Sequence, residues 1–146
     1  MLKLLSAPGT CALASHIALA DAGVAPDEID LLVAHGTSTP LNDLTETRAI
    51  KQAFGEHARR LTITAPKSMV GHMIGAAGII SALEAFGAMR EGIVPPTINL
   101  EEPDLPELDL DYTPLKARQK RVDTAMINGF GFGGQNAVAV FRRYTD

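Results

Sequence analysis

The sequence has little that would support disulfide bonds, membrane insertion or binding to a polyanion. Its single cysteine, Cys11, excludes an internal disulfide. No apolar run reaches the roughly 18 residues of a membrane span, and the run within residues 1–9 is too short for a signal peptide. The 13 basic and 17 acidic residues form no long run of one sign, so neither a nucleic acid nor a membrane surface is an expected partner. We expect a cytoplasmic chain with a mature or truncated beginning.

The chain has enough apolar residues for one folded domain over residues 1–146. With 146 residues and 46% hydrophobic content, it can bury about two thirds of its unfolded surface. The sequence predicts helices over 12–22, 43–55 and 71–90, the last of them buried on most sides. The evidence is helical periodicity, a D-x-x-E capping pattern at Asp43 and Glu46, and glycines that end helices.

Short apolar and β-branched runs predict the strands. Residues 29–34 and 61–65 suit parallel strands, and residues 123–128 and 137–141 suit an antiparallel hairpin closed by a glycine-rich turn. Prolines and carboxylates predict an irregular surface connection over 95–114, either mobile or facing a partner. The sequence therefore predicts an α/β fold in which helices cover a mixed sheet.

Two histidines and a lysine follow the two predicted parallel strands. His35 ends the first, and Lys67 and His72 follow the second. Loops that leave the carboxyl ends of neighbouring parallel strands lie side by side, so these side chains can meet. Two neutral imidazoles can donate hydrogen bonds to one enolate oxygen beside a thioester, and a nearby ammonium keeps them neutral. The alternative is that both histidines have only structural positions at a strand end and near a helix start.

Other polar and glycine-rich segments leave several interpretations open. Thr37, Ser38 and Thr39 either bind a polar substrate arm or satisfy loop backbone groups. The glycine-rich segment around Gly131 is too near the C-terminus for a dinucleotide site, so it is either a tight turn or part of an oxyanion hole. Cys11, before the first helix, is a poor candidate nucleophile, and the four histidines lack metal-site spacing, so we expect no metal.

Four motifs follow one another along the chain. They are AHGTSTPLND at 34–43, KSMVGH at 67–72 with GAAG at 75–78, PPTINL at 95–100, and GFGFGG at 129–134 followed by Asn136. In this order they resemble the C-terminal half of the β-ketoacyl-acyl-carrier-protein synthases of types I and II. The resemblance covers about residues 17–143.

The resemblance implies a thiolase-like half fold and a decarboxylative condensation of malonyl carrier protein with an acyl thioester, in fatty-acid or polyketide synthesis. His35 and His72 would be the two histidines of a Cys-His-His triad, with Lys67 beside them. Thr37 and Thr39 would bind the phosphopantetheine arm, which arrives on the carrier protein, so no separate cofactor is expected. Phe132 would gate the acyl pocket and, with Gly131 next to it, line the oxyanion hole.

The chain departs from this family pattern in ways that bear on activity. The N-terminal half with its cysteine nucleophile is absent, and so is the first strand of the C-terminal half, so we expect the isolated chain to be inactive. Ser81 replaces the acidic residue that pairs with the lysine, and Glu84 is a possible substitute; Gln135 replaces a common threonine.

The expected partners are an acyl carrier protein and an N-terminal half or partner subunit, in a homo- or hetero-oligomer. An alternative is a non-catalytic partner of a ketosynthase, similar to a chain-length factor or scaffold. A third, self-sufficient catalysis through Cys11, is the weakest interpretation.

Overall fold

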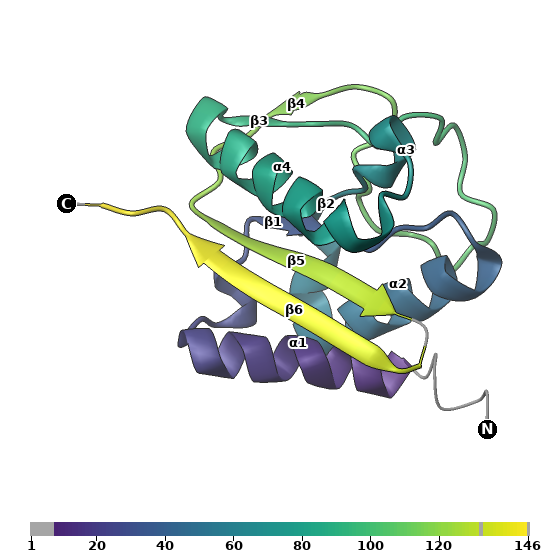
Figure 1. The fold of residues 1–146 in the computed structure, drawn as a ribbon, viewed down its shortest axis with the longest axis horizontal. Coiled ribbons are helices and arrows are strands. Elements are labelled where there is room, and N and C mark those ends of the chain that lie inside the picture. Colours follow the sequence, from purple (N-terminus) through teal and green to yellow (C-terminus); the bar gives the residue numbers. More distant parts are fainter. Residues whose placement is uncertain (1–7, 132, 146) are drawn as a thin grey trace.

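The structure, a computed structural model, describes residues 8–131 and 133–145. Within these residues, a sheet has the strand order β2-β1-β5-β6 (Figure 1). Strand β1 (Leu31–Val33) lies parallel to β2 (Thr62–Thr64) and to β5 (Thr124–Gly131). Strand β6 (Gln135–Arg142) pairs antiparallel with β5, and β3 (Ile93–Val94) pairs with β4 (Arg118–Gln119) outside the main sheet.

Helices cover both faces of the sheet (Figure 1). The helices α1 (Pro8–Ala22) and α2 (Pro40–Phe54) pack on one face, and α4 (Ala77–Glu91) packs on the other. Shorter turns are η2 (Pro26–Glu28), η3 (Gly55–Arg59), α3 (Lys67–Val70) and η4 (Ile74–Ala76).

The apolar run of β1 is explained by burial on both sides. Leu32 packs into the core beneath α1 and α2, whereas Leu31 and Val33 pack into a second cluster beneath α4. Side chains alternate between the two faces along a strand, so a strand covered on both faces needs apolar residues at every position. The predicted α/β fold with parallel strands and a C-terminal hairpin is confirmed.

The hairpin strands are longer than predicted. Gly129 and Gly131 lie within β5, opposite Ala137 and Gln135 of β6, so they belong to the sheet and not to the connecting turn. Positive φ angles occur at Gly133 and Gly134, which begin the return of the chain.

The predicted start of the second helix at Asp43 is wrong. Helix α2 begins at Pro40, because the Thr39 side chain accepts a hydrogen bond from the Asn42 backbone N–H, and a proline fits the first helical turn. Glu46, the expected second member of the capping pattern, is only 4% exposed and turns toward the sheet.

The prediction of one helix over 71–90, buried on most sides, is also wrong. Gly71 has φ of +74° and ends α3, so the chain reaches α4 only at Ala77. Ile79 and Leu83 on α4 are 66% and 59% exposed. The small apolar composition predicted burial, but in the described residues only one face of α4 meets the sheet.

The segment 95–114 is irregular, as predicted, but hydrogen bonds anchor it along the edge of β2. The Ile63 N–H donates to the Asp111 carbonyl at 2.8 Å, and the Thr113 hydroxyl donates to the Ile63 carbonyl at 2.7 Å. At the opposite edge of the sheet, β6 has no outer strand partner among residues 8–131 and 133–145. None of the helices described combines the length and hydropathy needed to cross a membrane.

Candidate active site

The loop after β1 places His35 at the carboxyl end of the parallel strands. Gly36 makes this loop possible, because it has φ of +46° and a Cβ there would lie 2.8 Å from the Ala65 Cβ. The loop after β1 therefore passes directly against the loop after β2, which carries Lys67. This close approach brings together two segments that lie about 30 residues apart in the sequence.

A buried carboxylate, which sequence reasoning missed, holds the His35 loop. Glu46 accepts hydrogen bonds from the backbone N–H groups of His35 and Gly36 at 2.8 and 2.9 Å. The side-chain amides of Asn128 and Asn42 donate to the same carboxylate at 3.0 and 3.3 Å. Glu46 thus fixes the loop backbone from within α2. In the sequence, Glu46 is recognisable only as a member of the D-x-x-E capping pattern, which does not indicate this role.

Lys67 lies against the first imidazole. Its ammonium donates a short hydrogen bond to the His35 carbonyl, and its Nζ lies 3.5 Å from His35 Nδ1. Burial lowers the pKa of Lys67, and the Glu46 carboxylate opposes this shift.

The two imidazoles lie together, with their ring centroids 5.7 Å apart and their planes nearly perpendicular. His35 Nδ1 accepts the Phe130 backbone N–H at 3.3 Å, and His72 Nδ1 accepts the Ile74 backbone N–H at 3.1 Å. In the neutral form of each ring, these hydrogen bonds place the proton on Nε2. Each ring can therefore donate one hydrogen bond from Nε2 to a third group.

The surroundings of His35 keep its imidazole neutral at neutral pH. Burial, the Lys67 ammonium and His72, in decreasing order of effect, lower the pKa of His35 from 6.5 to about 4. At pH 7 the ring is an uncharged hydrogen-bond donor, which suits it to stabilise a developing oxyanion.

The other predicted site residues have mixed positions. Thr37 and Thr39 lie beside the histidine loop, with their hydroxyl oxygens 3.0 Å apart, and Thr39 also caps α2. Gly131 is exposed at the end of β5 and directly follows Phe130, which contacts His35. Phe132 lies outside the described residues. The substrate-binding roles of all four residues stay predictions.

Cys11 does not have the surroundings of a nucleophile. It is 4% exposed in α1, and burial, with a smaller contribution from Glu46, raises the pKa of its thiol. A catalytic thiol needs the opposite, a lowered pKa and access to substrate. The interpretation of Cys11 as a self-sufficient nucleophile is therefore not supported.

Glu84 does not replace the missing acidic partner of Lys67. Ser81 is buried on α4, and the neighbour that stabilises ionised Glu84 is the Thr64 hydroxyl. The carboxylate that acts on Lys67 is Glu46. The partner of the lysine therefore comes from α2 and not from α4.

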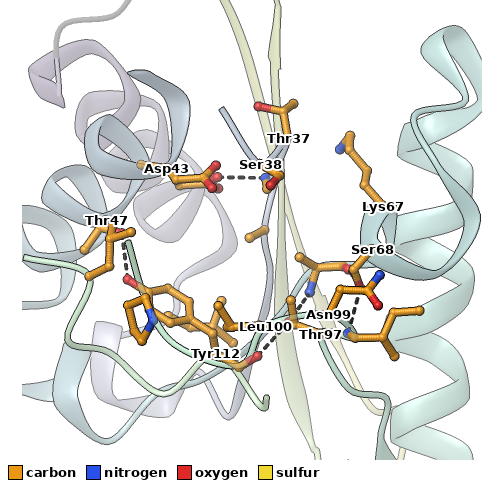
Figure 2. Close-up of a pocket in the computed structure, with 18 of the residues that line it drawn as sticks. Thr37, Ser38, Asp43, Thr47, Lys67, Ser68, Thr97, Asn99, Leu100 and Tyr112 are labelled. Atoms are coloured by element: carbon orange, nitrogen blue, oxygen red, sulfur yellow. Dashed lines mark hydrogen bonds between the residues drawn. The ribbon is translucent and has the colours of Figure 1, made fainter. Parts of the chain in front are cut away.

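A cavity of about 380 Å³ adjoins the site on the side of Lys67. Figure 2 shows Thr37 and Ser38 above it, Asp43 and Thr47 of α2 on one side, and Lys67 and Ser68 on the other. The segment 97–112 closes it below. Its described lining residues include Lys67 and the two neighbours of His35, Ala34 and Gly36, but no histidine. The described residues hold no group of three or more histidine, cysteine or acidic side chains arranged for a metal ion.

Comparison with known proteins identifies the family of this chain. The family described as "Beta-ketoacyl synthase, C-terminal domain" matches residues 6–101. The chain is 53% identical over 127 residues to 3-oxoacyl-[acyl-carrier-protein] synthase 2 of Synechocystis, covering 87% of this chain and 30% of that protein. The enzyme of the same name from Coxiella burnetii is 51% identical over 88% of this chain and 31% of its own length.

Solved structures give the same result. A β-ketoacyl synthase from Burkholderia phymatum superposes with a TM-score of 0.90 at 37% identity, over 97% of this chain and 34% of that one. The ishigamide ketosynthase/chain length factor also gives 0.90, at 39% identity, over 95% of this chain and 34% of that one. The chain spans about a third of the length of these relatives. Its motifs, its fold and these matches together show that it belongs to the β-ketoacyl synthase family, whose C-terminal domain it carries.

Proposed function

We propose that this chain supplies the two-histidine part of a β-ketoacyl-carrier-protein synthase site. The observation that carries the proposal is the pairing of His35 and His72, each with Nδ1 occupied by a backbone N–H and Nε2 left as a donor. Two such donors suit an enolate oxygen, because they place partial positive charge where negative charge develops.

The proposed reaction uses these donors in its first step. In a malonyl thioester, the bond between the α-carbon and the carboxylate breaks, carbon dioxide leaves, and the electron pair forms an enolate whose oxygen accepts both Nε2–H bonds. The α-carbon then attacks an acyl thioester held on a cysteine. The bond from the acyl carbon to sulfur breaks, and the thiolate leaves with the electron pair.

The cysteine of this reaction has to come from outside the chain, because Cys11 is buried with a raised pKa. Around α3, η4 and α4, large apolar side chains are exposed. These are Met69, Val70, Met73, Ile74, Ile79, Leu83 and Phe86. An apolar surface of this kind marks an interface. We propose that the N-terminal portion found in the longer relatives covers it, and that this portion brings the nucleophile to the exposed ring of His72.

The proposed substrates arrive on an acyl carrier protein, in the cytoplasm. One similar structure, 36% identical, holds a type II polyketide acyl-carrier protein in complex with its ketosynthase. This supports the same kind of partner for the assembled form of this chain. The phosphopantetheine arm would pass Thr37 and Thr39, whose exposed hydroxyls lie in the loop that carries His35.

Reconstitution tests the proposal. The purified chain is combined with a separately expressed N-terminal portion of a related synthase, malonyl carrier protein and acyl carrier protein. Carbon dioxide release and the mass of the carrier-bound product are then measured. The chain alone should release no carbon dioxide and gain no acyl mass, whereas the combination should do both.

Variants separate a catalytic role from a scaffold role. His35→Ala or His72→Ala should lower the rate of the reconstituted complex about 100-fold or more, as expected for loss of an oxyanion donor. His16→Ala, on the exposed surface of α1, is the matched control and should leave the rate unchanged. Full activity of both site variants would show that the chain is a non-catalytic partner.

A further inference from the structure

The PPTINL segment at 95–100 borders the site but has no role in the chemistry described above. Hydrogen bonds join it to β2 and to the loop that carries Lys67. The Thr64 hydroxyl donates to the Pro95 carbonyl at 2.9 Å, and the Ala65 N–H donates to Thr97 Oγ1 at 3.2 Å. The Ile98 N–H donates to Ser68 Oγ at 3.0 Å. The segment is therefore hydrogen-bonded to residues on both sides of Lys67.

The Lys67 loop depends on this contact because its own structure is short. Helix α3 has four residues and ends at Gly71. Isolated helices of this length are not stable in water, so the position of the lysine backbone has to be set by other segments.

Three further hydrogen bonds fix Thr97 to residues within 112–115. Its hydroxyl donates to the Tyr112 carbonyl at 2.7 Å, which leaves its oxygen lone pairs for the Ala65 N–H. Its backbone N–H donates to the Thr113 carbonyl at 2.8 Å, and its carbonyl accepts the Leu115 N–H at 3.0 Å. One hydroxyl therefore links the lysine loop to a segment anchored along β2.

The cavity beside Lys67 is bounded by this same network (Figure 2). The Thr47 and Tyr112 hydroxyls are 2.7 Å apart, and Ser68 Oγ donates to the Ala65 carbonyl at 2.8 Å while it accepts the Ile98 N–H. These polar groups already satisfy one another. The hydroxyl groups of Thr47, Ser68 and Tyr112 thus help to attach segment 95–112 beside the site.

We propose that Thr97 is a positioning residue that holds the Lys67 ammonium against His35. This inference deepens the proposed function, because it names a residue that acts on the site through another. If the Ala65 bond to Thr97 is lost, the lysine loop can move away from the His35 carbonyl, and the imidazole loses the positive charge beside it.

The ionisation of His35 reports this change directly. The charged and titratable groups that face His35 are Lys67, His72 and Glu46. The Lys67 ammonium lowers the pKa of His35, so a displaced ammonium raises it. A change limited to overall stability would not move this value in a folded protein.

The test is an NMR titration of the histidine ring protons in the full chain, with circular dichroism at each pH to confirm folding. Thr97→Val keeps the shape of the side chain and removes the hydroxyl. We expect the pKa of His35 to rise by about one unit in this variant. Thr97→Ser restores the hydroxyl and should return the pKa to the wild-type value. Thr124→Val makes the same substitution at a buried threonine at the start of β5 and should leave it unchanged.

Lys67→Met gives the shift that follows complete loss of the ammonium. Adding Thr97→Val to Lys67→Met should cause no additional shift, because both changes act through one charge. If Thr97→Val does not fold, Ser68→Ala removes the neighbouring link and should raise the same pKa. A folded Thr97→Val or Ser68→Ala variant with an unchanged pKa of His35 would overturn the proposal. The measurement needs no catalysis, so its outcome is distinguishable from failure of the reconstituted reaction.

Discussion

Replacing Glu84 with glutamine should stabilise the chain at alkaline pH and change little in acid. The Glu84 side chain is half-buried on α4, and its buried Oε1 has no hydrogen-bond partner among the described residues. Burial raises the pKa of Glu84 from 4.5 to about 7, and the Thr64 hydroxyl offsets part of this shift. The folded chain therefore binds this proton more tightly than the unfolded chain does.

The sign and size of the effect follow from this difference in pKa. Between pH 4.5 and about 7 the folded state holds more of the Glu84 proton, so this group lowers the free energy of unfolding as pH rises. At about 1.4 kcal/mol for each pKa unit, the cost of ionising Glu84 reaches about 3 kcal/mol above pH 7. Glu84→Gln keeps a neutral polar side chain and removes the ionisation, so it should gain about this amount at pH 8.

His35 acts with the opposite sign and has to be separated from Glu84. Its pKa falls from 6.5 to about 4, so the unfolded chain binds its proton more tightly, and stability rises with pH between these values. Because the imidazole is partly open to solvent, this contribution is reduced to about 1–2 kcal/mol. Wild type and Glu84→Gln share this contribution, so their difference isolates Glu84.

The assay is urea unfolding of both proteins at pH 4.5 and pH 8, followed by circular dichroism. The gain from Glu84→Gln should appear at pH 8 and be nearly absent at pH 4.5. Glu56→Gln, at an exposed position in η3, is the matched control and should show no difference between the two pH values. An equal effect of Glu84→Gln at both pH values would refute the reasoning.

Three further predictions concern the loop, the thiol and the core. Gly36→Ala should cost about 1–3 kcal/mol of unfolding free energy, because a Cβ there meets Ala65 Cβ at 2.8 Å and the φ of +46° disfavours a side chain. Gly9→Ala, with open space around it, is the control, and equal stabilities in urea would contradict the packing described for the histidine loop. Cys11 should react with a thiol reagent at pH 8 about 100-fold more slowly in the folded chain than in urea, because burial raises the pKa of its thiol and blocks access. Similar reaction rates in the two states, measured by absorbance, would show that the thiol is accessible in the folded chain. Leu32→Ala, at a fully buried position, should cost about 3 kcal/mol, whereas Leu41→Ala, 65% exposed, should cost under about 0.5 kcal/mol; comparable losses for the two variants would contradict the assigned core.

The strands and the meeting of the two histidines could be predicted because apolar patterns encode them directly. Residues of β1 and β2 are apolar or β-branched at every position, which is typical of strands covered on both faces. Once two such strands are parallel, the loops at their carboxyl ends have to be neighbours. The positions of His35, Lys67 and His72 then follow from chain order, although the catalytic roles stay predictions.

The residues that hold the site could not be predicted in the same way. Glu46 fits a capping pattern in the sequence, but its carboxylate binds backbone N–H groups of a loop ten or more residues away. Thr97 lies in a proline-rich segment that reads as a surface connection, yet its hydroxyl contacts the lysine loop. Such contacts depend on three-dimensional packing, and polar residues carry no periodic signal that reveals their partners.

The exposure of α4 shows a second limit of prediction from sequence. Its composition is that of a buried helix, and the sheet covers Ala85 and Ala88 while Ile79 and Leu83 stay exposed. A sequence reports how much apolar surface a helix has, but not whether the covering segment belongs to the same chain.

Strand β6 has a consequence for handling the chain in solution. Its eight residues contain no proline, and the only charged one, Arg142, is at the last position. Because β6 has no outer strand partner among the residues that the structure describes, the backbone donors and acceptors along its outer side form a row that another polypeptide can extend by hydrogen bonding. Intermolecular sheets grow from this arrangement. Concentration and storage time therefore need control in every experiment on the isolated chain, since strand addition at this edge would appear as a slow gain in light scattering.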